Sequence, residues 1–279
     1  MFKSHFWYQG VWCNGSIPVS KTVDGGSNPS APAKRGDYMQ KRYEKNLDEL
    51  LTPKVQESLL QKHIAVIGAG GQGSYVLEFL ARLGVASISF WDGDIYEESN
   101  LNRQLGCLKS TIGLKKVHVL YERLKDINPE ICYNVYDWYF GMDPADKDEI
   151  LSVDFIFYCA DCYQNIDTMR DILRVAIVNG IPMIDCPVTL LGGYVHIDTN
   201  RDLSHFDLTT QNEIKQKRET LGKQVWSNQS AYKCAIMAGE AVNQMVQYFS
   251  DCRFASRDST LHIDLYHHKY SQQDRFGDF

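Results

Sequence analysis

The chain has 279 residues, enough for one large or two small domains with a buried core. Its composition is 44% hydrophobic, 12% aromatic and 23% charged, which is typical of globular proteins and excludes disorder throughout. Twenty-nine basic and thirty-five acidic residues give a net charge of −6, so we expect no nucleic-acid partner held by general electrostatic attraction. Because no uncharged apolar run approaches the about 18 residues of a membrane span, we also expect no membrane partner.

Eight cysteines are scattered along the chain, and no charged-then-apolar leader of the secretory type precedes them. This pattern is typical of reduced thiols and predicts a cytoplasmic protein. Cys159 and Cys162 have the spacing of a zinc-ligand pair, but no second pair accompanies them. We therefore expect no structural zinc.

Residues 1–38 differ from the rest of the chain. They hold three of the eight prolines and many glycines and serines, without a sustained apolar period, and so predict a disordered tail. Residues 12–16 and 26–29 can be back-translated into arm consensus sequences of a bacterial tRNA gene, which favours a misassigned start codon. We expect translation to begin at Met39 and one domain to span residues 39–279.

From residue 39 onward, strand and helix patterns alternate. Short apolar runs predict strands over 63–67, 86–91, 131–135, 154–158, 182–185, 194–197 and 261–265. Apolar residues at helical spacing predict helices over 74–83, 111–127, 165–179 and 231–249. The polar stretch 199–228 is predicted to be a loop with some helix. The alternation favours an α/β fold: a Rossmann-like, mostly parallel sheet with helices on both faces and additional antiparallel strands in the C-terminal part.

A glycine-rich loop joins the first predicted strand to the first predicted helix. Its glycines are Gly68, Gly70, Gly71 and Gly73. Such a loop lets the backbone approach a phosphate, whose charge is met by N–H groups at the helix N-terminus. The alternative is a turn that serves only the packing of helix on strand. Asp92 ends the second strand, where a carboxylate can accept from both ribose hydroxyls, or where it serves only as a turn residue.

The segment that follows Asp92 argues against a nicotinamide dinucleotide. It places Ser99, Asn100 and Arg103 directly after the ribose-binding carboxylate, where a dinucleotide-binding domain would normally enter its next helix. Polar groups and a cation close to the phosphates suit a triphosphate better.

Residues 92–104, together with Ile112-Gly113, Lys115-Lys116 and Ala160-Asp161, resemble the HesA/MoeB/ThiF family of ubiquitin-activating-enzyme-like adenylyltransferases. The resemblance covers residues 40–200. It implies a homodimer that binds ATP and Mg²⁺. Its partner would be a small ubiquitin-fold sulfur carrier of the ThiS or MoaD type ending in Gly-Gly, whose C-terminal carboxylate attacks the α-phosphate. The products would be an acyl adenylate and pyrophosphate.

The resemblance also implies roles for single residues: Gly71 in the phosphate loop, Asp92 at the ribose, Ser99, Asn100 and Arg103 at the triphosphate, Lys116 as a phosphate-neutralising lysine and Asp161 as the Mg²⁺ ligand. We expect Arg103, Lys116 and Asp161 to be catalytic, since phosphoryl chemistry needs positioning and cations beside the developing charge. The alternatives are a surface ion pair for Arg103, a solvated basic face for Lys116 and a helix N-cap for Asp161.

Several positions depart from the family pattern. Lys45 occupies the place of an arginine that reaches across the dimer toward ATP, and it lacks the bidentate fork. Cys162 replaces an asparagine that contacts the nucleotide. No cysteine lies between Cys186 and Cys234, both of which we interpret as core residues. The sequence therefore supports adenylation without a covalent step on this chain.

Three other functions stay open at this point. The chain could activate a peptide or tRNA-bound carboxylate within the same family. It could be an NAD-linked Rossmann oxidoreductase, or a non-catalytic scaffold that keeps the fold.

Overall fold

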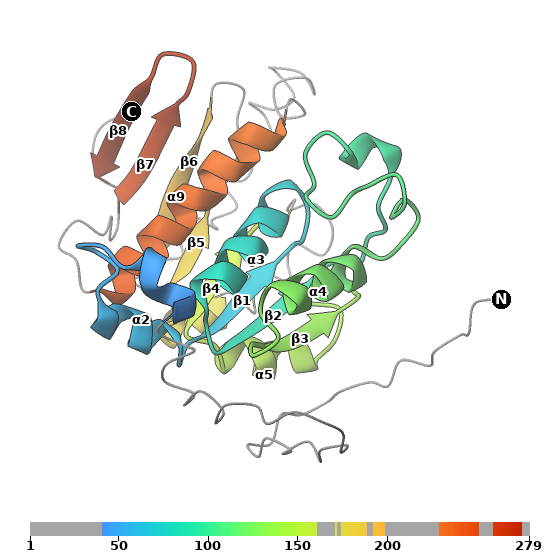
Figure 1. Ribbon diagram of the computed structural model, residues 1–279, viewed down its shortest axis with the longest axis horizontal. Helices are drawn as coiled ribbons and strands as arrows, with labels where there is room; N and C mark the ends of the chain where they lie inside the picture. Colours follow the sequence, from blue (N-terminus) through green and yellow to red (C-terminus); the bar gives the residue numbers. More distant parts are fainter. Residues whose placement is uncertain are drawn as a thin grey trace, which may run out of the picture. The chain divides into compact units, whose positions relative to one another are not determined.

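The structure is a computed structural model, and it describes residues 41–160, 171, 174–188, 192–198, 229–250 and 259–274 (Figure 1). All but the first two of these residues belong to one compact unit, Tyr43–Phe279. The predicted tail over 1–38, the magnesium ligand Asp161, Cys162 and the predicted loop over 199–228 lie outside the described residues.

An eight-stranded sheet forms the centre of this unit, in the order β3-β2-β1-β4-β5-β6-β7-β8. Five strands are parallel: β3 (Cys132–Tyr136), β2 (Ser87–Trp91), β1 (His63–Ile67), β4 (Phe155–Tyr158) and β5 (Met183–Asp185). Three antiparallel strands extend it: β6 (Gly192–Asp198), β7 (Ser259–Asp264) and β8 (Lys269–Asp274). The order 3-2-1-4-5 is that of a Rossmann-like sheet, which confirms the predicted fold class.

Helices cover both faces of the sheet (Figure 1). The helices whose bounds lie within the described residues include α2 (Pro53–Leu59), α3 (Gly71–Leu83), α4 (Lys116–Ile127), α5 (Ala145–Leu151) and α9 (Ala231–Phe249), with 3-10 turns η1 (Glu44–Asn46) and η2 (Glu98–Asn100). Successive side chains of a strand point to opposite faces. Accordingly, Ile64 and Val66 of β1 pack with α3, α4 and α9, while Ala65 and Ile67 pack with α5 and residues 176–177. No helix among the described residues has both the length and the apolar character needed to cross a bilayer.

The predicted helix over 111–127 begins only at Lys116. Gly113 adopts a left-handed φ of 86°, which stops the helical pattern on its N-terminal side. Its N–H donates to the carbonyl of Tyr96 over 2.8 Å, and the Tyr96 N–H donates to the carbonyl of Leu114 over 2.9 Å. This correction matters for the site, because the turn makes Lys116 the first residue of α4.

His63 lies in a polar cluster at the start of β1. Its Nε2 is 2.7 Å from the hydroxyl of Ser89 and 3.5 Å from Oε1 of Glu149. Burial lowers the pKa of His63 from its ordinary value, although Glu149 and Asp154 act in the opposite direction.

Acidification is therefore expected to destabilise the protein through His63. A histidine whose folded pKa is depressed binds its proton more readily when unfolded, so this part of the stability is present above about pH 6.5 and is lost below it. Urea unfolding at pH 7.5 and 5.5 measures the loss, and His63→Gln should reduce the difference. His118→Gln, at a histidine of α4 whose side chain is 42% exposed, is the control. An equal pH dependence in wild type and His63→Gln would contradict the prediction.

Candidate functional site

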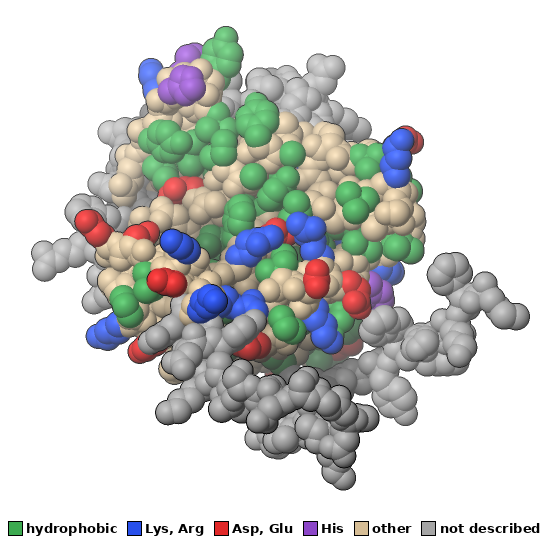
Figure 2. Space-filling model, in the orientation of Figure 1, with side chains coloured by type: hydrophobic (Ala, Val, Ile, Leu, Met, Phe, Trp, Pro, Cys, Tyr) green, Lys and Arg blue, Asp and Glu red, His purple; other side chains and the backbone are tan. Residues whose placement is uncertain are grey.

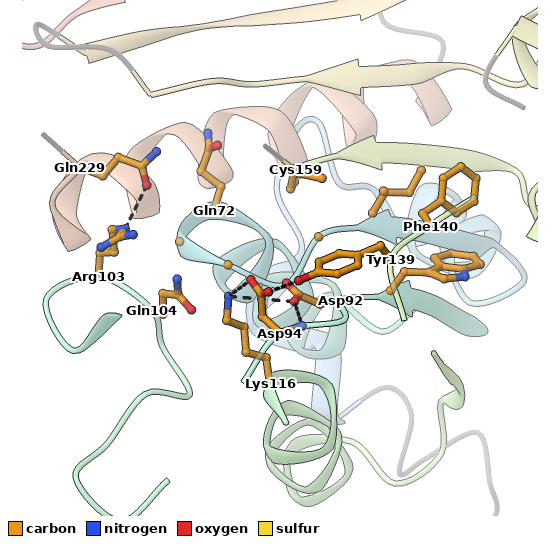
Figure 3. Close-up of a pocket in the computed structure, with 16 residues that line it drawn as sticks. Gln72, Asp92, Asp94, Arg103, Gln104, Lys116, Tyr139, Phe140, Cys159 and Gln229 are labelled. Carbon is orange, nitrogen blue, oxygen red and sulfur yellow. Dashed lines mark hydrogen bonds and ion pairs between the residues drawn. The ribbon is translucent and has the colours of Figure 1, made fainter. Parts of the chain in front are cut away.

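The carboxyl ends of the parallel strands open onto a cavity of about 340 Å³ (Figure 3). Open α/β sheets bind their ligands at this edge, and the volume lies in the range of small-molecule sites. Six of the ten predicted site residues line the cavity: Gly68, Gly70, Gly71, Asp92, Arg103 and Lys116. Gly73, Ser99 and Asn100 do not line it, and Asp161 is outside the described residues.

The glycine loop forms the floor of the cavity and leads into α3. Gly68 has a φ of 93°, and a Cβ there would lie 2.8 Å from the backbone nitrogen of Ala160, so the loop runs directly against the chain that leaves β4. Helix α3 begins at Gly71, and the first N–H groups of a helix have no intrahelical acceptor. Gly71 and Gln72, the first residues of α3, line the cavity, and N–H groups in this position commonly bind anions.

Gly73 serves the packing of this loop. A Cβ at Gly73 would lie 1.8 Å from the carbonyl oxygen of Gly68. The close approach of α3 to the loop is thus possible only because Gly73 has no side chain. Packing of helix on strand, the alternative to phosphate binding, explains why residue 73 is a glycine.

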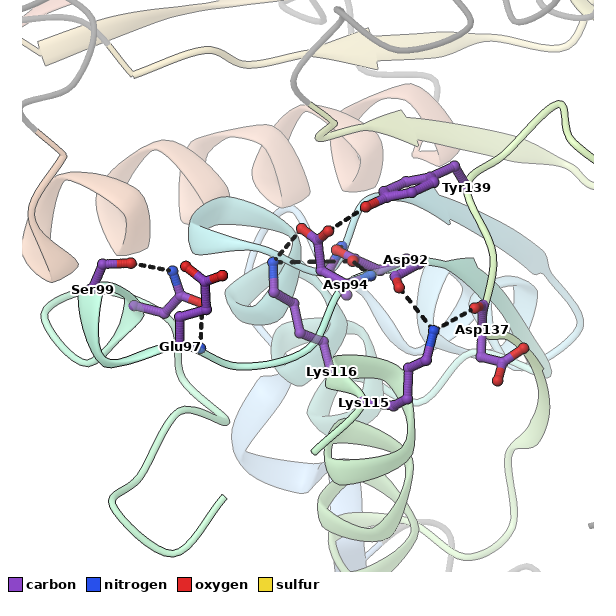
Figure 4. A network of polar contacts seen from close by, with 11 residues as sticks. Asp92, Asp94, Glu97, Ser99, Lys115, Lys116, Asp137 and Tyr139 are labelled. Carbon is purple, nitrogen blue, oxygen red and sulfur yellow. Dashed lines mark hydrogen bonds and ion pairs between the residues drawn. The ribbon is translucent and has the colours of Figure 1, made fainter. Parts of the chain in front are cut away.

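Asp92 and Lys116 meet in a polar network beside the loop (Figure 4). Asp92 Oδ2 accepts from the Ala69 N–H over 2.8 Å, and Oδ1 accepts from the Asp94 N–H over 2.9 Å. Lys116 Nζ is 2.8 Å from Asp94 Oδ2 and 4.0 Å from Asp92 Oδ1. The Lys116 side chain is only 7% exposed, so it does not belong to a solvated basic face.

Asp94 and Tyr139 complete the network, and neither was predicted from the sequence. The Tyr139 hydroxyl donates to Asp94 Oδ1 (Figures 3 and 4). Burial opposes ionisation of Asp94, but hydrogen bonds from Lys116 and Tyr139 outweigh it and hold the pKa of Asp94 below its ordinary value. The same bond raises the pKa of Tyr139 to about 12. Asp94 therefore balances the charge of Lys116, and an anionic ligand would have to share this lysine.

Arg103 lies at the opposite end of the cavity. Its Nε donates to Gln229 Oε1 over 3.1 Å, and NH1 donates to the Ser99 carbonyl over 3.0 Å and to Asn102 Oδ1 over 2.9 Å. These acceptors are neutral, and within the described part of the chain no carboxylate forms an ion pair with this guanidinium. The charge is available to an anion in the cavity.

Ser99 and Asn100 support the turn that carries Arg103. Asn100 Oδ1 accepts from the Glu97 N–H over 3.0 Å, and its Nδ2 donates to the Ser99 hydroxyl over 3.3 Å. Because Ser99 and Asn100 lie outside the cavity lining, their contact with a triphosphate stays a prediction.

The cavity has two chemically different ends with Asp92 between them (Figure 3). Ile67, Trp91, Tyr139 and Phe140 form an apolar and aromatic end. Gln72 and Gln104 lie at the other end, with Arg103. The Nε2 atom of Gln72 and the Oε1 atom of Gln104 are buried and have no hydrogen-bond partner among the described residues. Buried polar groups normally have a partner, so this end suits a polar ligand. The order of apolar end, carboxylate and cation matches the base, ribose and phosphates of a nucleotide.

Three thiols lie near the cavity: Cys159 is half-buried, and Cys186 and Cys234 are buried. Cys159 lines it, and a hydrogen bond to Cys159 together with burial holds the pKa of Cys186 well above its ordinary value. Burial raises the pKa of Cys234 to about 11. Both Cys186 and Cys234 are core residues, as predicted, and neither is activated as a thiolate.

No group of three or more potential metal ligands occurs among the described residues. Asp92 and Asp94 face the cavity, but their oxygens already accept from backbone N–H groups, Lys116 and Tyr139. A magnesium ion at this site would therefore depend on Asp161, and its binding stays a prediction.

The ThiF family model matches residues 43–275, so the chain belongs to the ThiF family. A tRNA threonylcarbamoyladenosine dehydratase of Haemophilus influenzae is 36% identical over 138 residues, which are 50% of this chain and 52% of that protein. A probable molybdopterin-synthase adenylyltransferase of Porphyra purpurea is 34% identical over 109 residues, 38% of this chain and 28% of that protein. The match to the first of these relatives thus spans about half of its length.

Two solved structures share the fold. PaaA has a TM-score of 0.66 at 23% identity, with 91% of this chain and 78% of that chain covered. MccB of Escherichia coli with ATP has a TM-score of 0.66 at 16% identity, with 84% and 70% covered.

Proposed function

We propose that this protein is an ATP-dependent adenylyltransferase that activates a carboxylate as an acyl adenylate. One observation carries the proposal above the others: the buried Lys116 and the available charge of Arg103 flank a glycine loop that opens a helix in one cavity. Membership of the ThiF family supports adenylation over the NAD-linked and scaffold alternatives.

In the proposed reaction a carboxylate oxygen attacks the α-phosphorus of ATP. A new oxygen–phosphorus bond forms, the bond between the α-phosphorus and the bridging oxygen breaks, and pyrophosphate leaves with the electron pair. Asp92 accepts from the ribose hydroxyls. Lys116, Arg103 and the N–H groups of α3 offset the growing negative charge. Mg²⁺, held by Asp161, would supply further charge neutralisation at the phosphates.

Two carboxylates are candidates for the substrate. The first is the C-terminal glycine of a ubiquitin-fold sulfur carrier ending in Gly-Gly, which is supported by the similarity to molybdopterin-synthase adenylyltransferase. The second is a carboxylate on tRNA, which is supported by the similarity to tRNA threonylcarbamoyladenosine dehydratases. The net charge of −6 gives tRNA no general electrostatic attraction, so we keep the carrier as the first candidate.

We also propose that the protein acts as a homodimer. Apolar side chains are exposed over the segment between β2 and α4 and over the start of α9: Leu101 37%, Leu108 57%, Leu114 51%, Tyr232 61% and Ile236 39%. Figure 2 shows hydrophobic side chains gathered on the face on which α9 lies in Figure 1. Hydrogen bonds from Asn102 and Arg103 to Gln229 join these two regions. Lys45 is exposed on η1, which suits a side chain that reaches toward a second subunit.

Exchange of labelled pyrophosphate into ATP tests the function. We expect exchange only when the carboxylate substrate is present, because the reverse reaction needs the acyl adenylate. A carrier without its final glycine is the control for the first candidate, and tRNA without the carboxylate-bearing modification is the control for the second. Arg103→Ala should lower exchange by about 10²-fold. Hydride transfer to NAD, or no exchange with either substrate, would contradict the proposal.

A further inference from the structure

Asp146 is a buried acid that lies next to the cavity without lining it. It belongs to the first turn of α5 and is 1% exposed. Its Oδ1 accepts from the indole Nε1 of Trp91 over 2.9 Å and of Trp138 over 3.1 Å. Its Oδ2 accepts from the N–H of Gly141 over 2.7 Å and of Asp143 over 3.3 Å. A carboxylate offers about four acceptor positions, and Asp146 uses four.

The donors belong to two separate walls of the aromatic end of the cavity. Trp91 ends β2 and lines the cavity itself. Trp138, Gly141 and Asp143 belong to the segment between β3 and α5, which carries Tyr139 and Phe140 into the cavity. The Trp91 and Phe140 rings meet edge to face at 5.2 Å. One carboxylate therefore fixes both walls relative to each other.

The position of Tyr139 also affects the charged part of the site. Its ring lies against the Gly93 backbone, where an added Cβ would be 3.0 Å from the ring. Its hydroxyl donates to Asp94, which pairs with Lys116 (Figure 3). A shift of the segment between β3 and α5 would thus disturb both the aromatic wall and this contact.

We propose that Asp146 is a positioning residue for the nucleotide: it fixes the aromatic wall on which the base packs, without touching the ligand. The inference rests on the proposed binding of ATP. A purely structural acid would affect the stability of the fold, whereas a positioning acid affects affinity for the base-bearing ligand in protein that is fully folded.

Calorimetric titration of the full chain with ATP and with pyrophosphate tests this role. Asp146→Asn keeps the shape but replaces one acceptor oxygen by a donor. We expect the Kd of ATP to rise about ten-fold, the factor for loss of one hydrogen bond to a charged group. The Kd of pyrophosphate should change by less than about three-fold, because the wall reaches Lys116 only through the Tyr139–Asp94 contact, while Arg103 is held by Gln229, Ser99 and Asn102. At saturating ATP, kcat should stay within about three-fold, so that the effect lies in KM.

Two control variants and a second test variant separate positioning of the wall from changes in charge or stability. Asp148→Asn makes the same charge change at an exposed position of α5 and should leave both affinities unchanged. Ile150→Val removes one methyl group from the same apolar cluster but no hydrogen bond to Asp146, and should leave both affinities unchanged too. Trp138→Phe removes one N–H donor to Asp146. It replaces Asp146→Asn in the same titrations if that variant does not fold.

Two outcomes would overturn the inference: unchanged ATP affinity in the folded variants, or an equal loss for ATP and pyrophosphate. Wild-type protein that does not bind ATP would instead refute the proposed function.

Discussion

Replacing Lys116 by alanine is expected to lower the rate of adenylation by about 10²-fold or more. The Lys116 side chain is buried, so solvent screens its charge little, and its Nζ lies 4.0 Å from Oδ1 of Asp92. Its loss removes a preorganised charge and also leaves Asp94 unbalanced at the cavity wall. Repulsion from this carboxylate should raise the KM for ATP in addition to lowering kcat. Pyrophosphate exchange at varied ATP concentration measures both effects.

The double variant Lys116→Ala/Asp94→Asn separates these two effects. Removing the unbalanced carboxylate should restore part of the ATP affinity but not kcat. Lys125→Ala is the matched control, since this lysine is in the last turn of the same helix and its contacts with described residues are to Tyr121, through the hydroxyl and the ring. Near-wild-type exchange by Lys116→Ala at saturating ATP would show that the site has been misassigned.

The elements best predicted from sequence are those whose pattern reflects burial. The run 63–67 is apolar because β1 is buried on both faces, and the structure gives the strand the same bounds. Helix α9, Ala231–Phe249, also matches, because its buried side chains between Cys234 and Val246 recur at helical spacing.

Elements that depend on distant contacts were missed. Helix α5 has only seven residues, four of them charged, and its Asp146 is buried by partners in β2 and in the segment after β3. Strand β8 has the polar sequence KYSQQD, and it is a strand because it pairs with β7. Neither has a periodicity that local sequence could reveal.

For the candidate site, too, residues close together in sequence were predicted and residues brought in by the fold were missed. The glycine loop, Asp92, Arg103 and Lys116 lie close together in sequence and were predicted, and Asp94 was visible in the Asp-Gly-Asp string but was not assigned a role. Tyr139 and Gln229 reach the cavity from segments distant in sequence, and only the fold brings them there. The roles of the four loop glycines could not be separated either, because the sequence does not tell which glycine faces a ligand and which packs against the backbone.

Gly73→Ala tests whether Gly73 is needed for packing, in which case the substitution should cause a large loss of stability. The added Cβ would lie 1.8 Å from the Gly68 carbonyl oxygen, a backbone atom that cannot turn away. Gly68 is itself held against Ala160, so the loop cannot retreat without disturbing β4. Overpacking of this kind costs about 1–3 kcal/mol or more, and it outweighs the gain of about 1 kcal/mol that alanine brings to a helix interior. We expect a net loss of about 2 kcal/mol, or a fall in Tm of about 5 °C.

Gly239→Ala is the matched control, because it makes the same substitution inside α9. There the nearest atom to the added Cβ is Phe79 Cε2 at 3.9 Å, which is ordinary contact. Alanine should therefore be neutral or stabilise by up to about 1 kcal/mol, so the two substitutions are expected to have opposite signs. Urea and thermal unfolding measure both. If Gly73→Ala were as stable as wild type, α3 could not approach the Gly68 carbonyl as closely as the structure has it, and the packing role of Gly73 would be wrong.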